Sequence, residues 1–180
     1  MLTLFAAIRP PEPIIDEILS VQTGFDGMNW IVPENLHITL GYFGPLHDET
    51  TEILDREINR NPGTGFDLRL GTAGTFGGKY IHTLWLGVEP SPALSDLHHH
   101  IRKAARRAGV EMEKRKYVPH VSLAYPRRAI DKIALAKFLN RLSGWRSDRF
   151  LVDEFALYSS HHNKTGPNSY RVEATYPLLG

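Results

Sequence analysis

The hydrophobic positions of the chain follow two spacings, one typical of strands and one typical of helices. Apolar runs bounded by glycine or proline predict strands at residues 2–8, 36–43, 66–70, 81–88, 118–125, 150–158 and 170–176. Apolar residues three and four positions apart predict helices that begin near residues 11–13, 48, 91–92 and 130. The glycine-rich stretch 71–78 is predicted to be a loop.

The order of these elements predicts an α+β fold. Helices and strands are interleaved, and the short connections between strand pairs favour antiparallel pairing. The second half of the chain repeats the rhythm of the first half. A chain of 180 residues is the size of one domain, or of two small lobes that share a core. We therefore expect a single domain over residues 1–180.

Composition excludes several kinds of chemistry. The chain has no cysteine, which rules out disulfides, thiolate metal sites and a cysteine nucleophile, and which fits a cytoplasmic location. Its formal net charge of +1 gives no strong overall field, so an anionic partner would be attracted by local clusters. The apolar start at residues 1–8 is too short for a membrane span and lacks the basic region of a secretory signal.

Two segments of the chain repeat one another: residues 37–42 are HITLGY and residues 120–125 are HVSLAY. In a strand, alternate residues face opposite sides. A histidine, a hydroxyl residue and a small residue are therefore expected on one face of each strand, namely His37, Thr39 and Gly41, and His120, Ser122 and Ala124. The small residue is expected to leave room beside the polar pair. The alternate residues are expected in the core, namely Ile38, Leu40 and Tyr42, and Val121, Leu123 and Tyr125.

A pair of histidines suits proton transfer at phosphorus. The reference pKa of histidine is ~6.5, so one imidazole can be neutral and the other protonated near neutral pH. The neutral ring can take a proton from water or a hydroxyl, and the protonated ring can give one to a leaving oxygen. The hydroxyls of Thr39 and Ser122 can donate to the non-bridging oxygens of a phosphoryl group. This scheme needs no metal, and it predicts the opening or closing of a phosphodiester.

Two other interpretations of the repeat remain open. The segments could be homologous strands whose histidines are hydrogen-bonded core residues. They could also contribute to a zinc site, since imidazoles bind zinc. A zinc site needs further ligands, and neither segment has a carboxylate nearby in its strand.

The sequence resembles the two-histidine phosphoesterase superfamily, and within it the bacterial RNA 2′,3′-cyclic phosphodiesterases, also called 2′-5′ RNA ligases. The family signature is present as His37-Ile38-Thr39-Leu40 and as His120-Val121-Ser122-Leu123. Other matching stretches are Asn35-Leu36, Phe43-Gly44, Leu84-Trp85-Leu86-Gly87-Val88, Pro119, Leu157-Tyr158-Ser159-Ser160, Gly166, Tyr170 and Pro177-Leu178. The resemblance thus extends nearly from end to end.

The resemblance implies two pseudo-symmetric lobes, each an antiparallel sheet with outer helices, that face a central cleft. It implies a cofactor-free hydrolysis of a terminal RNA 2′,3′-cyclic phosphate to a 2′-phosphate, and the reverse 2′-5′ joining of RNA ends is also associated with the family. By this analogy His37 is the proton donor to the leaving 3′-oxygen and His120 is the proton acceptor that activates water. Thr39 and Ser122 then hold the phosphate.

The expected partners follow from the same resemblance. They are RNA ends with a 2′,3′-cyclic phosphate, on a tRNA-like molecule or an oligonucleotide, and the protein is expected to be a monomer without membrane contact. Two alternative functions remain: a phosphodiesterase acting on a small nucleotide or on ADP-ribose cyclic phosphate, and a non-catalytic RNA-binding module. The near symmetry of the two motifs means that the residues alone do not assign acid and base.

The sequence departs from the family at two places where an arginine is common, which here are Thr3 and Tyr125. Arg127 and Arg128 follow Tyr125 closely and are the obvious replacements for an RNA contact. Residues 102–116 hold seven basic side chains and lead into the second motif, so they either guide an RNA backbone or form a solvated helix face.

Further candidates are less specific. Arg115 lies in this basic run, and Phe43 could stack on a base. Three adjacent histidines, His98, His99 and His100, suggest a metal tract. Consecutive residues on a helix point about 100° apart, so these three cannot converge on one ion. We expect them on a surface face.

Overall fold

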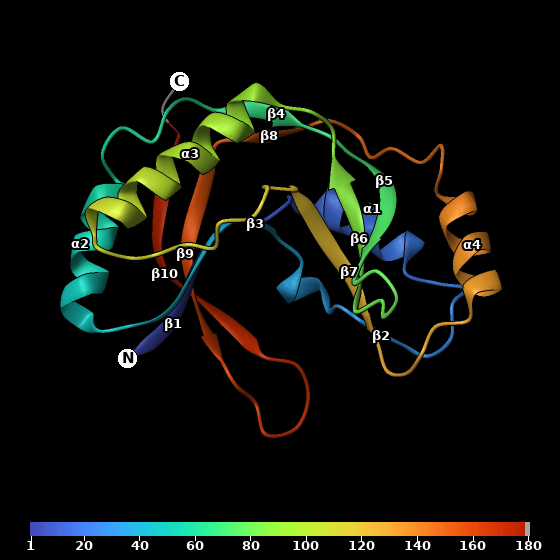
Figure 1. Ribbon diagram of the computed structural model, residues 1–180. Helices are drawn as coiled ribbons and strands as arrows, with labels where there is room; N and C mark the ends of the chain where they lie inside the picture. Colours follow the sequence, from blue (N-terminus) through green and yellow to red (C-terminus); the bar gives the residue numbers. More distant parts are fainter. Residues whose placement is uncertain (179–180) are drawn as a thin grey trace.

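The computed structural model describes residues 1–178 and contains one large antiparallel sheet (Figure 1). Along the sheet its strands are β10 (Ser169–Pro177), β9 (Glu154–His161), β1 (Leu2–Ile8), β3 (Ile38–Leu46), β7 (His120–Pro126), β6 (Thr83–Val88) and β5 (Leu70–Phe76). β2 (Met28–Trp30) also pairs with β7, and β4 (Phe66–Leu68) pairs with β8 (Phe150–Val152) in a small second sheet. The predicted mixed fold with antiparallel pairing is confirmed.

The helices begin where the sequence predicts them. They are α1 (Glu12–Val21), α2 (Asp48–Ile58), α3 (Pro92–Arg107) and α4 (Lys132–Arg141), with a short 3-10 helix at Pro33–Asn35. Ser91 caps α3 by accepting a hydrogen bond from the N–H of Leu94, and Asp131 caps α4 in the same way through Ile133. Among residues 1–178, no helix combines the length and the apolar character needed to cross a membrane.

The large sheet has two halves that meet where Ile38 of β3 pairs with Val121 of β7. β1, β9 and β10 lie beyond β3, and β5 and β6 lie beyond β7. The connections repeat, because β1 leads into α1 and pairs with β3, while β6 leads into α3 and pairs with β7. The two expected sheets are therefore joined in one, and the division into two lobes of a single domain stays a prediction.

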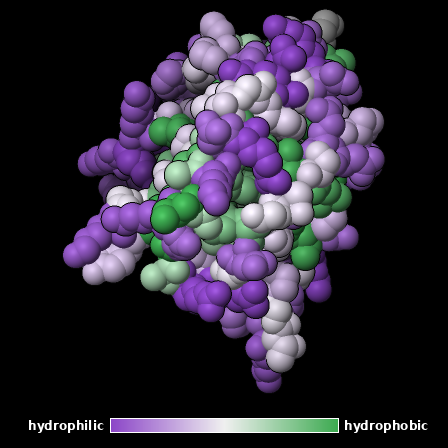
Figure 2. Space-filling view, turned by 90° about the vertical axis from the view of Figure 1, so that its right-hand side faces the viewer, coloured by the Kyte–Doolittle hydropathy of each residue, from purple (hydrophilic) through white to green (hydrophobic). Residues whose placement is uncertain are grey.

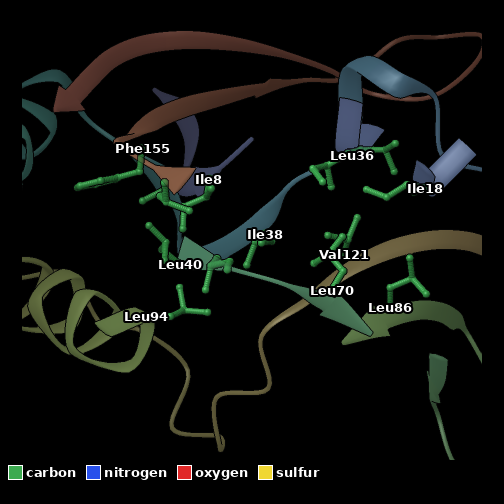
Figure 3. Packing of buried hydrophobic residues seen from close by; sticks show 14 of the residues in the cluster. Ile8, Ile18, Leu36, Ile38, Leu40, Leu70, Leu86, Leu94, Val121 and Phe155 are labelled. Carbon is green, nitrogen blue, oxygen red and sulfur yellow. The ribbon is translucent and has the colours of Figure 1, made fainter. Parts of the chain in front are cut away.

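The helices cross between the two halves of the sheet. α3 follows β6 but packs against β3, and Gln22, directly after α1, donates a hydrogen bond to the carbonyl of Leu123 in β7. Figure 3 shows Leu94 of α3 beside Leu40 of β3, and it shows Ile18 of α1 at the end of the core where Val121 of β7 lies. These side chains are at most 1% exposed, and burying such a residue stabilises the fold by about 1.5–3 kcal/mol. The core therefore ties each half of the sheet to a helix from the other half.

β3 contains a bulge inside its histidine motif. Thr39 pairs with Ala7 of β1, and Gly41 pairs with the preceding residue of β1, Ala6. Leu40 is therefore an extra residue that has no partner of its own in this register.

β7 contains the same bulge at the equivalent place. Ser122 pairs with Trp85 of β6, and Ala124 pairs with the preceding residue of β6, Leu84. Leu123 is therefore the extra residue. The two motifs match in backbone shape as well as in sequence.

The bulges change which side chains reach the surface. We expected Tyr42 and Tyr125 in the core, and this prediction is wrong, because they are 56% and 46% exposed. An extra residue reverses the alternation of faces beyond it. The expected core residues that precede each extra residue, or are that residue, are buried as predicted, namely Ile38, Leu40, Val121 and Leu123.

Some strand boundaries differ from those predicted. Residues 71–78, predicted as a loop, belong mostly to β5. A Cβ atom on Gly74 would lie 2.3 Å from the indole of Trp85, so this glycine permits close packing within the sheet rather than a loop. β3 continues through Pro45, which pairs with Thr3 of β1. β3 meets β7 only near Ile38, so the other side of Pro45 lies at the sheet edge, where a proline is tolerated.

Figure 2 shows the face of the molecule that carries α4. Hydrophilic side chains cover most of this face, and hydrophobic ones lie between them in small groups. α4 itself buries Leu135 and Phe138 and exposes Ile133. This is the pattern of an amphipathic helix that covers a core and faces water.

Candidate active site

The two repeated histidines are held in the same way. Nδ1 of His37 lies 2.7 Å from the carbonyl oxygen of Asn35, and Nδ1 of His120 lies 2.6 Å from that of Val118. A carbonyl oxygen only accepts hydrogen bonds, so Nδ1 of each ring carries a hydrogen. Nε2 is then the nitrogen of each ring that can take or give a proton.

The pairing of Ile38 with Val121 sets the order of polar side chains across the junction. In an antiparallel pair, the residue before one partner lies opposite the residue after the other. This places His37 beside Ser122, and Thr39 beside His120. Each histidine therefore lies beside the hydroxyl residue of the other motif.

Two adjoining cavities open on this polar group. The first, of about 320 Å³, is lined by Thr39, His120 and Ser122 among others. The second, of about 690 Å³, is lined by His37 and again by Ser122. Tyr125 also lines both cavities. The four predicted polar residues thus come together at one site with two compartments.

Aromatic rings fix the orientation of both imidazoles. The ring centre of Phe5 lies 5.0 Å from that of His37, and Tyr170 meets the same imidazole edge-on at 5.4 Å. Phe76 meets His120 edge-on at 4.8 Å, and Trp85 lies 6.1 Å away. Such packing restricts ring rotation and keeps water from part of each ring.

Burial makes both imidazoles weak bases. It lowers the pKa of His37 to about 4, an effect opposed by the hydrogen bond to Asn35 and increased by the proximity of His120. Burial also lowers the pKa of His120, where the Val118 carbonyl opposes the effect and the Arg115 guanidinium adds to it. Both rings are therefore neutral near pH 7 when no anion is bound. A phosphate beside them would favour a protonated ring.

The structure corrects two details of the predicted site. A Cβ atom on Gly41 would lie 2.7 Å from Met112 and 2.8 Å from Ile101, so the expected gap beside the polar pair is filled by these side chains. Phe43 is only 6% exposed and belongs to the core, so the prediction that it contacts RNA is wrong. The bulge at Leu40 turns Phe43 inward and Tyr42 outward.

The predicted surface face of three histidines is also wrong at its first residue. His98 is 8% exposed, and its imidazole stacks on Tyr117 with ring centres 3.8 Å apart. Among residues 1–178, histidine and acidic side chains form no group of three or more that could hold a metal ion.

Basic side chains lie on one side of the site. The first cavity is lined by three basic residues, Arg102, Arg115 and Lys116, and by one acidic residue, Glu113, which forms a 2.7 Å ion pair with Arg115. The lining of the second cavity, as far as residues 1–178 form it, contains no lysine, arginine, aspartate or glutamate. The cationic lining therefore belongs to the compartment of His120.

Arg127 and Arg128 lie elsewhere. Both are exposed and lie outside the linings of these two cavities, and the side chain of Arg128 lies over Gly27. Asn168 and Tyr170 also line the second cavity, just before and at the start of β10. Sequence reasoning noted Tyr170 only as a match to the family and predicted neither residue in the site. Their distance along the chain from both motifs left no local signal.

The comparison with known proteins gives the family. The family model of the 2′-5′ RNA ligase superfamily matches residues 10–164. The chain belongs to this superfamily. A relative from Methanothermobacter thermautotrophicus, named RNA 2′,3′-cyclic phosphodiesterase, is 27% identical over 171 residues, which cover 91% of this chain and 92% of the relative. Proteins of the same name from Thermotoga maritima and Escherichia coli are 30% and 29% identical and cover 86% and 87% of this chain, and 80% and 86% of their own lengths.

Solved structures of other proteins have the same fold. A crystal structure of a phosphoesterase superimposes with a TM-score of 0.83 at 24% identity and covers 99% of both chains. E. coli LigT in complex with 3′-AMP superimposes with a TM-score of 0.82 at 26% identity, also over 99% of both chains. The arrangement of β3 and β7 about the two histidines therefore belongs to an established fold.

Proposed function

We propose that this protein is an RNA 2′,3′-cyclic phosphodiesterase that opens a terminal cyclic phosphate to a 2′-phosphate. The observation that carries the proposal is the placement of each motif's histidine beside the other motif's hydroxyl, across the pair of Ile38 and Val121. A single phosphoryl group between the strands can then meet two proton-transfer groups and two hydrogen-bond donors. The names of the relatives supply the substrate class.

The reaction follows from this arrangement. The neutral imidazole of His120 takes a proton from a water molecule, whose oxygen attacks phosphorus. The bond from phosphorus to the 3′-oxygen breaks, and the protonated imidazole of His37 gives its proton to that oxygen. Thr39 and Ser122 donate to the non-bridging oxygens, where negative charge grows in the transition state. The products are a 3′-hydroxyl and a 2′-phosphate, and the assignment of acid and base rests on the family.

The acid must be charged although burial favours its neutral form. The cyclic phosphate carries a negative charge, and an anion within about 4–6 Å raises the pKa of a histidine. Binding of the substrate therefore protonates the imidazole that later acts as the acid. This couples proton uptake to substrate binding, so the empty site is not charged in advance.

The unequal charge of the two cavities indicates where the RNA chain lies. Single-stranded RNA carries one negative charge per nucleotide, and lysine and arginine side chains that neutralise phosphates release counterions. Arg102, Arg115 and Lys116 line the first cavity. We place the preceding phosphates of the RNA chain at these cations, the terminal cyclic phosphate at the junction of the cavities, and its nucleoside on the side of His37. An RNA end is preferred to a small cyclic nucleotide, which would gain little from these cations.

The second cavity suits the nucleoside that carries the cyclic phosphate, because the leaving 3′-oxygen of that nucleoside must lie beside His37. The cavity has a volume of about 690 Å³, and its lining includes Trp30, Tyr125 and Tyr170. Uncharged aromatic side chains can stack on the base of this nucleoside. We propose 2′-5′ joining of RNA ends as a further activity, in which a 5′-hydroxyl replaces the attacking water beside His120. A monomeric state and a cytoplasmic location stay predictions.

The test is incubation with an oligonucleotide that ends in a 2′,3′-cyclic phosphate, in the presence of a chelator. We expect a 2′-phosphate product, identified by its resistance to a 3′-specific phosphatase and by ³¹P NMR. His37→Ala and His120→Ala should each abolish turnover while the proteins remain folded by circular dichroism. Turnover that survives both single changes, or a wild-type protein that binds RNA without cleaving the cyclic phosphate, would contradict the proposal.

A further inference from the structure

The carbonyl oxygen of each bulged leucine is bound by a side chain from the opposite half of the protein. Nε2 of Gln22, which follows α1, donates to the carbonyl of Leu123 at 3.1 Å, and the N–H of Ile31 donates to the same oxygen at 2.8 Å. Nδ1 of His98, in α3, donates to the carbonyl of Leu40 at 2.8 Å. A bulge disturbs the strand ladder locally, and a buried carbonyl there needs another donor. The fold thus supplies an equivalent donor in each half.

A second side chain, Tyr117, holds the backbone of the first motif, and it stacks on His98. The ring of Tyr117 lies parallel to that of His98, with an angle of 2° between the planes. The hydroxyl of Tyr117 donates to the carbonyl of Thr39 at 2.9 Å. Thr39 and Leu40 therefore each have their carbonyl fixed by one member of a stacked pair.

These two bonds fix the backbone that carries the Thr39 hydroxyl. The carbonyl of Thr39 belongs to the peptide group that follows its Cα, and the carbonyl of Leu40 belongs to the next one. Fixing both limits the rotation that the bulge would otherwise allow at Thr39. His98 and Tyr117 also line the first cavity, but His98 is only 8% exposed and its Nδ1 is held by the carbonyl of Leu40 rather than by either motif histidine.

We propose that His98 is a positioning residue, which holds the Leu40 carbonyl and, with Tyr117, fixes the Thr39 hydroxyl toward the phosphate. This inference rests on the proposed function. Burial lowers the pKa of His98, so its ring is neutral near pH 7, and its hydrogen lies on Nδ1 because the carbonyl can only accept. The sequence pattern His98-His99-His100 thus contains one residue that serves the active site.

The primary variant is His98→Phe, which keeps an aromatic ring against Tyr117 and removes the donor. We expect kcat to fall about 5- to 50-fold with KM within about twofold of wild type, because a misplaced donor is lost mainly in the transition state. His98→Asn keeps an N–H in the position of Nδ1, so it should restore kcat to within about threefold. Tyr117→Phe removes only the hydroxyl on Thr39 and should resemble His98→Phe, which keeps the test valid if His98→Phe does not fold.

The matched control is His100→Phe. Nε2 of His100 donates to the carbonyl of Ile58 at 2.7 Å, so this variant also removes a histidine bond to a carbonyl, on the same helix but away from the cavities. We expect its kcat to stay within about twofold of wild type. A fall in kcat equal to that of His98→Phe would show that loss of α3 stability explains both, and would overturn the proposal.

The decisive measurement is a double-mutant cycle with Thr39→Ala. If His98 acts through Thr39, adding His98→Phe to Thr39→Ala should change kcat by less than about twofold. Effects that multiply, or a folded His98→Phe protein with wild-type kcat, would overturn the inference. If the wild-type protein does not turn over the cyclic phosphate, the proposed function fails by itself. The same variants can then be titrated with inorganic phosphate by NMR, where weaker binding by His98→Phe but not by His100→Phe supports the positioning role, and equal binding contradicts it.

Discussion

Ile38 and Val121 pair across the junction of the two half-sheets, and both are fully buried. This contact sets the distance between the two histidine motifs, because it lies between the polar pairs on either side. A catalytic site divided between two strands depends on that distance to well under an ångström. The apolar core under the junction therefore bears directly on the proposed chemistry.

We expect Ile38→Ala to lower activity more than its loss of stability explains. Removing a fully buried isoleucine to alanine should lower the free energy of unfolding by about 2–5 kcal/mol, measured by urea denaturation. The cavity lies under the junction, so kcat on a 2′,3′-cyclic-phosphate oligonucleotide should also fall at least tenfold under conditions where the variant is folded. Ile58→Ala, an equally buried isoleucine in α2 that lies outside both cavity linings, should lose similar stability and keep kcat within about threefold. Equal losses of kcat in the two variants would contradict a special role for the junction.

Thr39→Ala and Ser122→Ala should each lower kcat about 10- to 1,000-fold, with a small effect on KM. Each change removes a hydroxyl that donates to a phosphoryl oxygen whose charge grows in the transition state. Thr39→Ser and Ser122→Thr keep the donor and are the matched controls, which we expect within about fivefold of wild type. Steady-state kinetics with one oligonucleotide substrate measure all four. A loss confined to KM would show that these hydroxyls bind the ground state and transition state equally.

The pH dependence of stability should reveal the buried histidine. His37 has a pKa of about 4 when folded and ~6.5 when unfolded, so the unfolded chain binds a proton more readily. Its contribution to stability is complete above pH 6.5 and is lost as the pH falls toward 4. Between pH 7 and pH 4.5, the free energy of unfolding of His37→Gln should therefore fall by about 1–3 kcal/mol less than that of wild type, measured by urea midpoints. Parallel curves for the two proteins would show that the imidazole is not desolvated.

The enzyme should remain active at pH values below ~6.5, the ordinary pKa of histidine. The profile of kcat/KM reports the free enzyme, in which burial lowers the pKa of both His37 and His120. We expect the limb that requires a neutral base to lie below pH 6.5. The kcat profile reports the complex, where the bound phosphate favours the protonated acid, so its alkaline limb should lie at higher pH than that of kcat/KM. Identical limbs in the two profiles would argue against proton uptake on binding.

The sequence was sufficient to predict the direction of the side chains at the start of each motif and insufficient beyond its third residue. Strict alternation holds from His37 to Thr39, and the paired copy made the pattern specific. It fails after Leu40, because the register shifts there by one residue and turns Tyr42 outward and Phe43 inward. Nothing about a leucine in an apolar run marks a bulge, which depends on the partner strand and on donors from distant helices.

Sequence reasoning also fails where the role of a residue depends on a contact with a distant part of the chain. Gly74 was predicted to be part of a loop, since a glycine-rich stretch has no apolar alternation. It lies in β5, and it is a glycine because the indole of Trp85 occupies the space that a side chain would need. His98 looked like one of three surface histidines until the carbonyl of Leu40 gave it a partner. In both cases the deciding neighbour lies on another element.

The path of the RNA can be tested by the dependence of binding on salt. For a single strand, the slope of log K against log salt falls in magnitude by about 0.7 for each phosphate contact removed. The double change of Arg115→Gln and Lys116→Gln should therefore reduce the slope by about 1.4, because both side chains line the cationic cavity. The matched control is the double change of Arg127→Gln and Arg128→Gln, which removes the same charge from a surface outside both cavities and should leave the slope unchanged. His120→Ala in both backgrounds allows binding of an intact cyclic-phosphate oligonucleotide to be followed by fluorescence anisotropy without turnover. The opposite result, a reduced slope only for the Arg127 and Arg128 pair, would place the RNA at the far end of β7 and refute the path through the first cavity.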